Sequence, residues 1–168
     1  MKKYVIAAGI CMLALFACAY SQETDHAMVA GKIGTSSNKS QYMNDINTRA
    51  MRDFVSRYNN VTDEVWHKSN NSYIAVFIRD SVHYRVMYNS HGDLSYVIKY
   101  YEEPKLDRDI RATVKSVYYD YSIFIVQEIE SPDAPTVYII NLQGATDWKK
   151  IKLVNNDMEV LEEYKKAK

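Results

Sequence analysis

The chain has 168 residues and 47% of them are hydrophobic, which is enough for one substantial core or two small cores that share a surface. Basic and acidic side chains both number 21, so no net positive field draws the molecule to nucleic acid. The composition therefore excludes a disordered tail and a general nucleic-acid binder. The 15 tyrosines favour β-rich structure with an amphipathic surface.

Residues 1–21 have the layout of a secretory signal peptide. Two lysines precede an apolar run from Tyr4 to Ala19, and polar residues follow it. The run is shorter than the roughly 20 residues of a bilayer-spanning helix, so we expect export and cleavage after Ser21. Cleavage there removes both cysteines and leaves no transmembrane segment. The alternative is a lipobox, in which Cys18 carries a lipid anchor. The sequence therefore predicts a periplasmic or secreted protein, or an outer-membrane lipoprotein.

Small polar residues without apolar periodicity fill residues 22–47, which predicts a flexible spacer before a single domain at 48–164. Thr48 stands where a helix N-cap would, and residues such as Met51 and Val55 recur at helical spacing up to residue 59. Four β-like runs follow this predicted helix, at Glu64–Lys68, Tyr73–Arg79, His83–Tyr88 and Leu94–Tyr101. The breaks between them are short, which predicts an antiparallel meander.

The same order begins again past Pro104. Asp107 or Asp109 can cap a second helix, which carries Val114 and Val117 along one face and runs to about residue 119. The strands predicted after it are Ile123–Glu130, Thr136–Leu142, Trp148–Val154 and Met158–Tyr164.

The two halves can be superposed as a tandem repeat. An offset of 108 minus 49, or 59, pairs Val55 with Val114, and the offset drifts to 64 in the later strands. We interpret residues 48–103 and 105–164 as two α-ββββ repeats, although two unrelated runs of a helix and strands would give the same pattern. Each repeat alone buries little, so an α+β fold with one shared antiparallel sheet and both helices on one face is expected.

Alternation along the strands indicates which side chains face the helices. Tyr84 and Val86 contrast with His83 and Arg85, and we expect the first pair to lie beneath a helix. Aromatic side chains on the opposite face would have no helix to cover them and could bind a protein. The candidates for this face are Trp66, Tyr73, Tyr96, Tyr100 and Trp148. The alternative is that these rings simply fill the core.

Motifs for catalysis or for a metal site are not found. The four histidines, at positions 26, 67, 83 and 91, have no metal-ligand spacing, and no GxSxG elbow presents a serine. The acid pair Glu128/Glu130 resembles glycosidase carboxylates, but paired acids on strands more often serve as solvated edge charges. The sequence therefore predicts no enzyme, no metal and no cofactor.

Diffuse hydrophobic spacings over residues 48–164 carry a family resemblance. The segments concerned are Phe54 and Tyr58, Val65-Trp66, Tyr73-Ile74-Ala75-Val76-Phe77, Asn89-Ser90-His91-Gly92-Asp93, Tyr119-Asp120-Tyr121-Ser122-Ile123, Val137-Tyr138-Ile139-Ile140 and Trp148. In these segments the chain resembles the PepSY-like, β-lactamase-inhibitor-protein-like (BLIP-like) family of small exported proteins from Bacteroidetes. The resemblance implies a curved antiparallel sheet with two helices on one side, and it implies no catalytic residues.

Two functional hypotheses follow. The first is an exported, non-enzymatic module that binds a protein or peptide through the open aromatic sheet face, as an inhibitor or regulator of an envelope or secreted protein. The second is a small-ligand carrier or an unrecognised enzyme with a site between sheet and helices, where His83 could act as acid or base.

Overall fold

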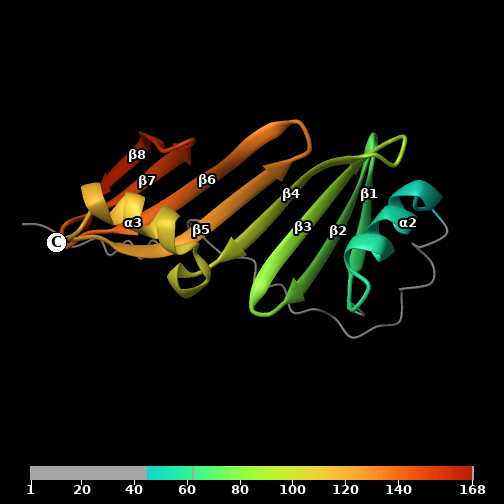
Figure 1. Cartoon of the computed structure of the whole chain (residues 1–168), viewed down its shortest axis with the longest axis horizontal. Helices are drawn as coiled ribbons and strands as arrows, with labels where there is room; N and C mark the ends of the chain where they lie inside the picture. Colours follow the sequence, from blue (N-terminus) through green and yellow to red (C-terminus); the bar gives the residue numbers. More distant parts are fainter. Residues whose placement is uncertain (1–44, 62, 168) are drawn as a thin grey trace, which may run out of the picture. The chain divides into compact units, whose positions relative to one another are not determined.

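The computed structural model describes residues 45–61 and 63–167, all within one unit of the chain (Figure 1). In chain order the elements are α2 (Thr48–Arg57), β1 (Val65–Ser69), β2 (Ser72–Arg79), β3 (Val82–Asn89), β4 (Leu94–Tyr101), the 3-10 helix η1 (Glu103–Lys105), α3 (Arg108–Val117), β5 (Ser122–Ser131), β6 (Ala134–Gln143), β7 (Asp147–Val154) and β8 (Asp157–Lys165). The predicted helices and strands are confirmed to within a few residues. The signal peptide, the alternative lipid anchor at Cys18 and residues 22–44 of the predicted spacer lie outside the described residues. Within the described ranges, no helix is both long and apolar enough to span a membrane.

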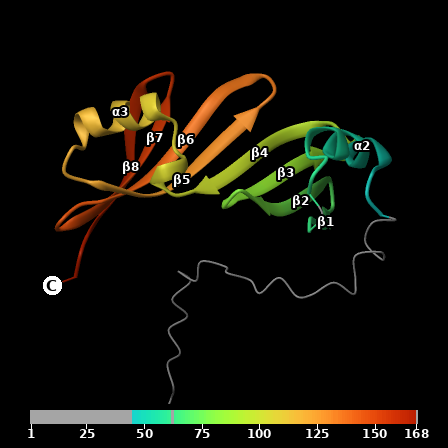
Figure 2. The same cartoon turned by 60° about the horizontal axis from the view of Figure 1, so that its bottom comes forward.

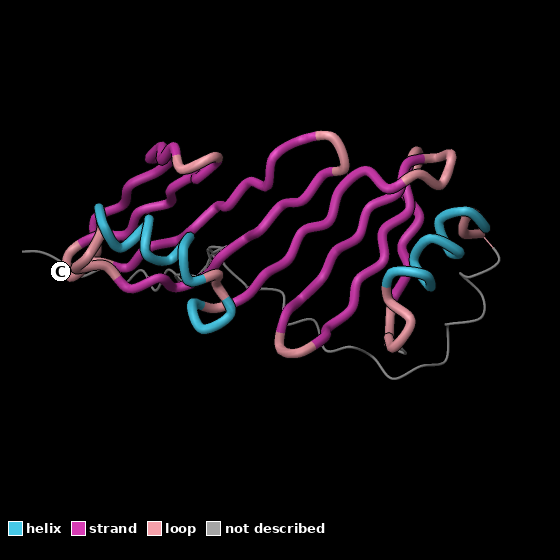
Figure 3. The backbone as a smooth tube through the Cα atoms, viewed as in Figure 1, coloured by secondary structure: helices cyan, strands magenta, loops and turns pink. Residues whose placement is uncertain are grey.

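The strands form one eight-stranded antiparallel sheet in the order β1 to β8, so each strand pairs with its neighbours in sequence (Figure 3). The two halves join where Val97–Tyr101 of β4 pairs with Val126–Glu130 of β5. Val97 belongs to the core beneath α2, and Tyr101 belongs to the core beneath α3. These two residues are four positions apart on one strand, so both helices cover the same face of the sheet. The predicted shared sheet is therefore confirmed (Figure 2).

Both α-helices begin at a side-chain cap. Asn47 accepts a hydrogen bond from the backbone N–H of Arg49 at 2.8 Å, and Asp107 accepts one from that of Asp109, also at 2.8 Å. Capping by Thr48 is wrong, because Thr48 is already the first helical residue. The spacer also ends earlier than residue 47, since Ile46 is buried in the core beneath α2. A side-chain oxygen at these positions satisfies backbone donors that the first helical turn leaves unpaired.

The caps correct the repeat alignment. They are offset by 107 minus 47, or 60, and the same offset pairs the buried residues Phe54 and Val114. The predicted offset of 59 paired Val55 with Val114, but Val55 is 57% exposed and Val114 is fully buried. Val117, which was expected on the buried face of its helix, is 55% exposed. Successive helical residues differ by about 100° around the axis, so an error of one residue moves a side chain to another face.

Positive backbone φ angles occur at the turns that the sequence marks as breaks. Asp80 and Ser81 join β2 to β3, and Asn155 and Asn156 join β7 to β8, all with φ between 50° and 65°. A two-residue hairpin turn with both φ angles positive matches the right-handed twist of its flanking strands. Gly92, between β3 and β4, has φ 85°.

Candidate functional site: the open face of the sheet

The face opposite α2 and α3, which we name the open face, receives every second side chain of each strand. Register between neighbouring strands defines rows that cross the sheet on this face. One row, which we name the central row, runs Val65, Val76, Arg85, Ile98, Ile129 and Val137 from β1 to β6. The adjacent row runs Ile78, His83, Tyr100, Gln127, Ile139, Lys152 and Glu159 from β2 to β8.

The middle of the open face is apolar and uncharged. Ile98, Ile129 and Val137 are consecutive in the central row, and each is only half-buried because no helix covers this side. Tyr100 and Ile139 flank Gln127 in the adjacent row, and they too are half-buried. A contiguous apolar patch that solvent reaches is a common feature of protein-binding surfaces.

An aromatic group lies on the open face towards the end of the sheet formed by β7 and β8. The ring of Trp148 meets that of Phe124 edge-on, with 5.5 Å between centroids. Tyr164 is the residue opposite Trp148 on β8, and it is 59% exposed. The Lys166 Nζ lies 5.1 Å from the centroid of the Trp148 ring and donates to the Gly144 carbonyl at 2.6 Å. A cation over an indole ring is attracted to it, so the Trp148 ring already has a partner within the chain, the Lys166 ammonium.

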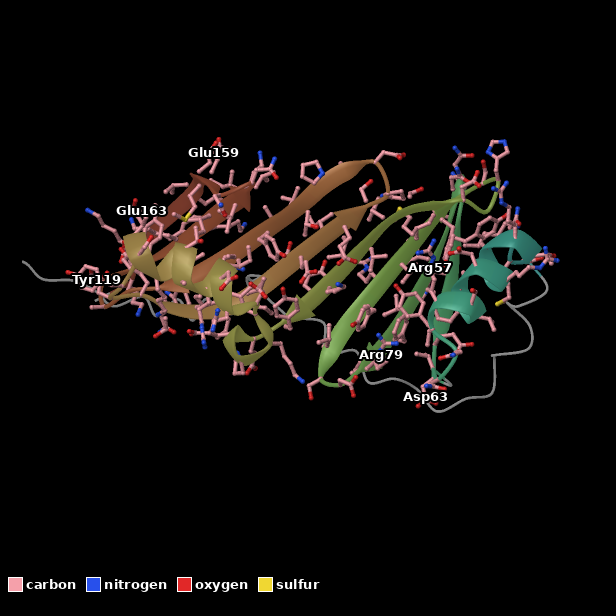
Figure 4. All side chains as sticks on the ribbon, in the orientation of Figure 1. Arg57, Asp63, Arg79, Tyr119, Glu159 and Glu163 are labelled. Carbon is pink, nitrogen blue, oxygen red and sulfur yellow. The ribbon has the colours of Figure 1, made fainter. Side chains whose placement is uncertain are left out.

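Charges on the open face differ between the two ends. On β7 and β8, Lys150 pairs with Glu162 at 2.8 Å, and Lys152 lies 3.7 Å from Glu159, which Figure 4 labels. The register places no Asp or Glu on the open face of β1 to β5, whereas it places His67, His83 and Arg85 there. The face is therefore internally neutralised at one end and unbalanced at the other.

The structure divides the five predicted contact residues between the two faces. Tyr96, Tyr100 and Trp148 lie on the open face. Trp66 and Tyr73 do not, because the register places them opposite Ala75 and Tyr88, which are buried beneath α2.

Trp66 is 5% exposed and packs edge-on against Phe54 at 5.2 Å, so its assignment to the open face is wrong. Alternation within β1, where Val65 and His67 flank it, would have given the correct side. The aliphatic side chains of the central row were not among the predicted contact residues, all of which are aromatic.

The helix side carries a charged group where β4 and β5 meet. The Lys99 ammonium donates to Glu128 at 2.9 Å and to Glu130 at 2.6 Å, and the Tyr101 hydroxyl donates to Glu128. Burial alone would lower the pKa of Lys99, but these two hydrogen bonds outweigh it and raise that pKa to about 12. Burial alone would raise the pKa of Glu128, and the bonds from Tyr101 and Lys99 lower it instead. Glu128 and Glu130 are thus structural ion-pair partners on a central strand, so their interpretation as edge charges is wrong.

A hollow of about 230 Å³ opens on the helix side. Its lining includes Arg57 of α2, labelled in Figure 4, and Glu130 of β5. Both charged groups already have internal partners, since Arg57 donates to Asp53 at 2.7 Å and Glu130 accepts from Lys99. His83 lies on the opposite side of the sheet and is exposed, so it cannot serve a site between sheet and helices. Among the described residues, no group of three or more His, Cys, Asp or Glu side chains could hold a metal ion.

Comparison with known proteins supports the fold. No family model and no curated protein matches the chain. Among solved structures, a BLIP-like protein from Bacteroides fragilis has a TM-score of 0.56 at 14% identity, with 71% of this chain and 85% of that chain covered. A DUF2874 family protein from Bacteroides ovatus has a TM-score of 0.56 at 14% identity, with coverage of 70% and 86%. A protein from Bacteroides eggerthii, described as a candidate periplasmic protein, has a TM-score of 0.55 at 13% identity, with coverage of 71% and 88%.

These identities establish a common fold, and the fold is the one that the sequence resemblance implied. An open antiparallel sheet with two helices on one face is shared with the BLIP-like protein. Membership of its family does not follow from a likeness at this level of identity.

Proposed function

We propose that the protein is an exported, non-enzymatic binding module that engages a partner protein through the open face, as an inhibitor or regulator of an envelope or secreted protein. The observation that carries the proposal is the half-buried apolar middle of that face, over β4 to β6, which no helix covers. Burial of such a surface in a complex removes apolar area from water, at roughly 25 cal/mol per Å² before the costs of association.

The structural neighbours support the same class of function and compartment. One neighbour is a BLIP-like protein, and another is described as a candidate periplasmic protein. These descriptions agree with the signal peptide that the sequence predicts and with a surface suited to protein contact. Inhibition of a particular enzyme does not follow from them.

Partner capture from an envelope extract tests the proposal. The chain is immobilised as wild type and as the double variant Tyr96→Ala/Tyr100→Ala, which removes two rings from the open face. Trp66→Ala is unsuitable, because it would empty the core beneath α2 rather than change the open face. We expect one or more proteins, identified by mass spectrometry, to bind the wild type and to be lost from the double variant.

The matched control is Val117→Ala/Tyr119→Ala, which removes two exposed side chains from the end of α3 and the loop after it. Figure 4 labels Tyr119. This control should retain every partner, and the thermal midpoints of all the variants should confirm that they fold. Retention of all captured proteins by Tyr96→Ala/Tyr100→Ala would reject the open face as the contact surface.

A further inference from the structure

The open face carries one arginine at the border of its apolar middle. Arg85 is exposed, and in the central row it lies between Val76 of β2 and Ile98 of β4. Its neighbours across both strand pairs are therefore aliphatic. The methylene stem of an arginine can cover such aliphatic neighbours, whereas its guanidinium brings a positive charge to their border.

Arg85 differs from Lys150 and Lys152 on the same face in having no acid beside it. In the described part of the chain, Lys150 and Lys152 of β7 each have a glutamate of β8 within 4.0 Å. In the same part of the chain, the Arg85 side chain forms no hydrogen bond or ion pair. The register brings no carboxylate to the open face of β1 to β5. The other basic residues on the open face of those strands, His67 and His83, offer it no carboxylate either.

Lys166 also lacks an acidic partner, but its ammonium is held over the Trp148 ring and donates to the Gly144 carbonyl. Among the described residues of the open face, Arg85 is thus the one Lys or Arg whose charged group has no partner in the described part of the chain.

Docking would change the energetics of this side chain. A partner that covers the apolar middle of the open face also reaches Arg85, because Arg85 lies opposite Ile98 in the same row. Removing an unpaired charge from water is costly, and a carboxylate that accepts two parallel N–H hydrogen bonds from the guanidinium offsets that cost. Arginine is also one of the residues that most often dominate binding energy at protein interfaces.

We propose that Arg85 is the specificity anchor of the open face, and that the partner protein presents an Asp or Glu side chain to it from within an apolar surface. This inference rests on the proposed function and names the chemistry of its partner. The rest of the contact is apolar and comes from Ile98, Tyr100 and their neighbours in the two rows. The acidic side chain fixes the position of the partner on the open face and the choice of partner, because an uncharged surface would leave the guanidinium desolvated and unpaired.

The test uses a random peptide display library selected against the immobilised full chain. Selected peptides are sequenced, synthesised and measured by fluorescence polarisation against wild type, Arg85→Gln and the matched control Arg52→Gln. Arg52 is an exposed arginine of α2, on the helix side. We expect each selected peptide to contain an essential Asp or Glu, and Arg85→Gln to weaken its binding by about tenfold or more. Arg52→Gln should leave the Kd unchanged.

A double-mutant cycle then assigns the contact. Changing the peptide's acid to its amide should weaken binding to wild type by a similar factor, and should have little further effect on Arg85→Gln. The charge reversal Arg85→Glu should select peptides with a basic residue in that place. Because Arg85 is exposed, these variants should melt at the wild-type temperature.

Two results would separate this inference from the proposed function. In the first, the selected peptides lose affinity for Tyr96→Ala/Tyr100→Ala but bind Arg85→Gln as tightly as wild type. This result would overturn the pairing of Arg85 with a carboxylate, and it would still support the open face as the contact surface. Peptides whose affinity is unchanged by all of these substitutions would overturn both.

Discussion

Beneath α2 the core is built largely from rings, whereas beneath α3 it is built largely from aliphatic side chains. Phe54 contacts Trp66 and Phe77 with centroids 5.2 and 5.5 Å apart. The second core instead surrounds the fully buried Val114 and Ile140 with Val, Ile and Leu side chains. The two halves keep the same order of elements, and both cap the helix one residue before it begins. The two halves therefore share their element order and the position of the helix cap, while their cores are filled by different side chains.

Side chains of the first half also pack in the core of the second half. Val82, which lies on β3 in the first half, is packed in the core of the second. The half-buried Tyr84 packs against both cores. Together with the β4–β5 pairing, these contacts couple the halves, and we expect them to unfold in one cooperative transition.

The largest expected effect comes from a charge in the second core. Val114→Asp places a carboxylate at a fully buried position that has no partner, which should cost more than about 4 kcal/mol and unfold the protein. Val55→Asp, at the position that the sequence alignment paired with it, should change the free energy of unfolding by about 0.5 kcal/mol or less. Urea titrations followed by circular dichroism measure both variants.

The tryptophans report the two halves separately in the same experiment. Trp66 lies in the first half and Trp148 in the second, so Trp148→Phe and Trp66→Phe each leave one fluorescent probe. Adding the milder change Val114→Ala should lower the midpoint seen by either probe by the same amount. A midpoint that falls only at Trp148 would show two independent domains and break the shared-sheet description.

The outcome for Val55 and Val114 shows how much of this molecule was predictable. Strand order, turns and the shared sheet followed from alternation and from short breaks, because both are local signals. The predicted offset between the two helices was wrong by one residue. Each helix is short and carries exposed valines, so its hydrophobic residues alone do not define which face is buried. Tyr100 was predicted correctly on the open face. Trp66 was not, because its aromatic ring was taken as a sign of a contact surface, whereas the alternation of side chains along β1 places it on the helix side. The isolated position of Arg85 depends on cross-strand register, which the sequence does not show.

A second comparison concerns two glycines, Gly92 beside the α2 cap and Gly144 in the turn between β6 and β7. Gly92 has φ 85°, and a Cβ there would lie 2.7 Å from the Asn47 Oδ1 and 2.9 Å from the Ala50 backbone nitrogen. Gly92→Ala should therefore destabilise the protein by about 3 kcal/mol, through backbone strain and displacement of the α2 cap. At Gly144 the nearest atoms belong to the Asp147 and Tyr121 side chains, which can move. Gly144→Ala should cost less, and equal losses in thermal melts of the two variants would contradict this account.

The junction between the halves should give stability a dependence on pH. The pKa of Glu128 is lowered in the folded protein, so its contribution is full above its ordinary pKa of 4.5 and is lost as pH falls through the lowered value. Glu128→Gln should cost about 2 kcal/mol at pH 7, because it leaves Lys99 and Tyr101 with a neutral partner. That difference from wild type should shrink in acid, as urea titrations at pH 7 and pH 3 would measure. A difference that stays constant between these pH values would show that the carboxylate charge is not the cause.

The smallest effect compares one tyrosine–aspartate hydrogen bond in each half. The hydroxyl of the fully buried Tyr88 donates to Asp53 of α2 at 3.0 Å, whereas that of Tyr121 donates to Asp147 at 2.8 Å on a more open surface. Burial, and then the bond to Asp53, raise the pKa of Tyr88, so the hydroxyl stays protonated and remains a donor.

Tyr88→Phe keeps the ring in the aromatic core and removes only the hydroxyl, which should cost about 1 kcal/mol. Tyr121→Phe should cost less, because water can replace the lost donor at Asp147. Urea titrations of both variants, with Tyr119→Phe as an exposed control that has 82% of its surface in solvent, measure the order. A larger loss of unfolding free energy for Tyr121→Phe than for Tyr88→Phe would contradict this order. It would mean that the Tyr121–Asp147 bond stabilises the fold more than the Tyr88–Asp53 bond between β3 and α2.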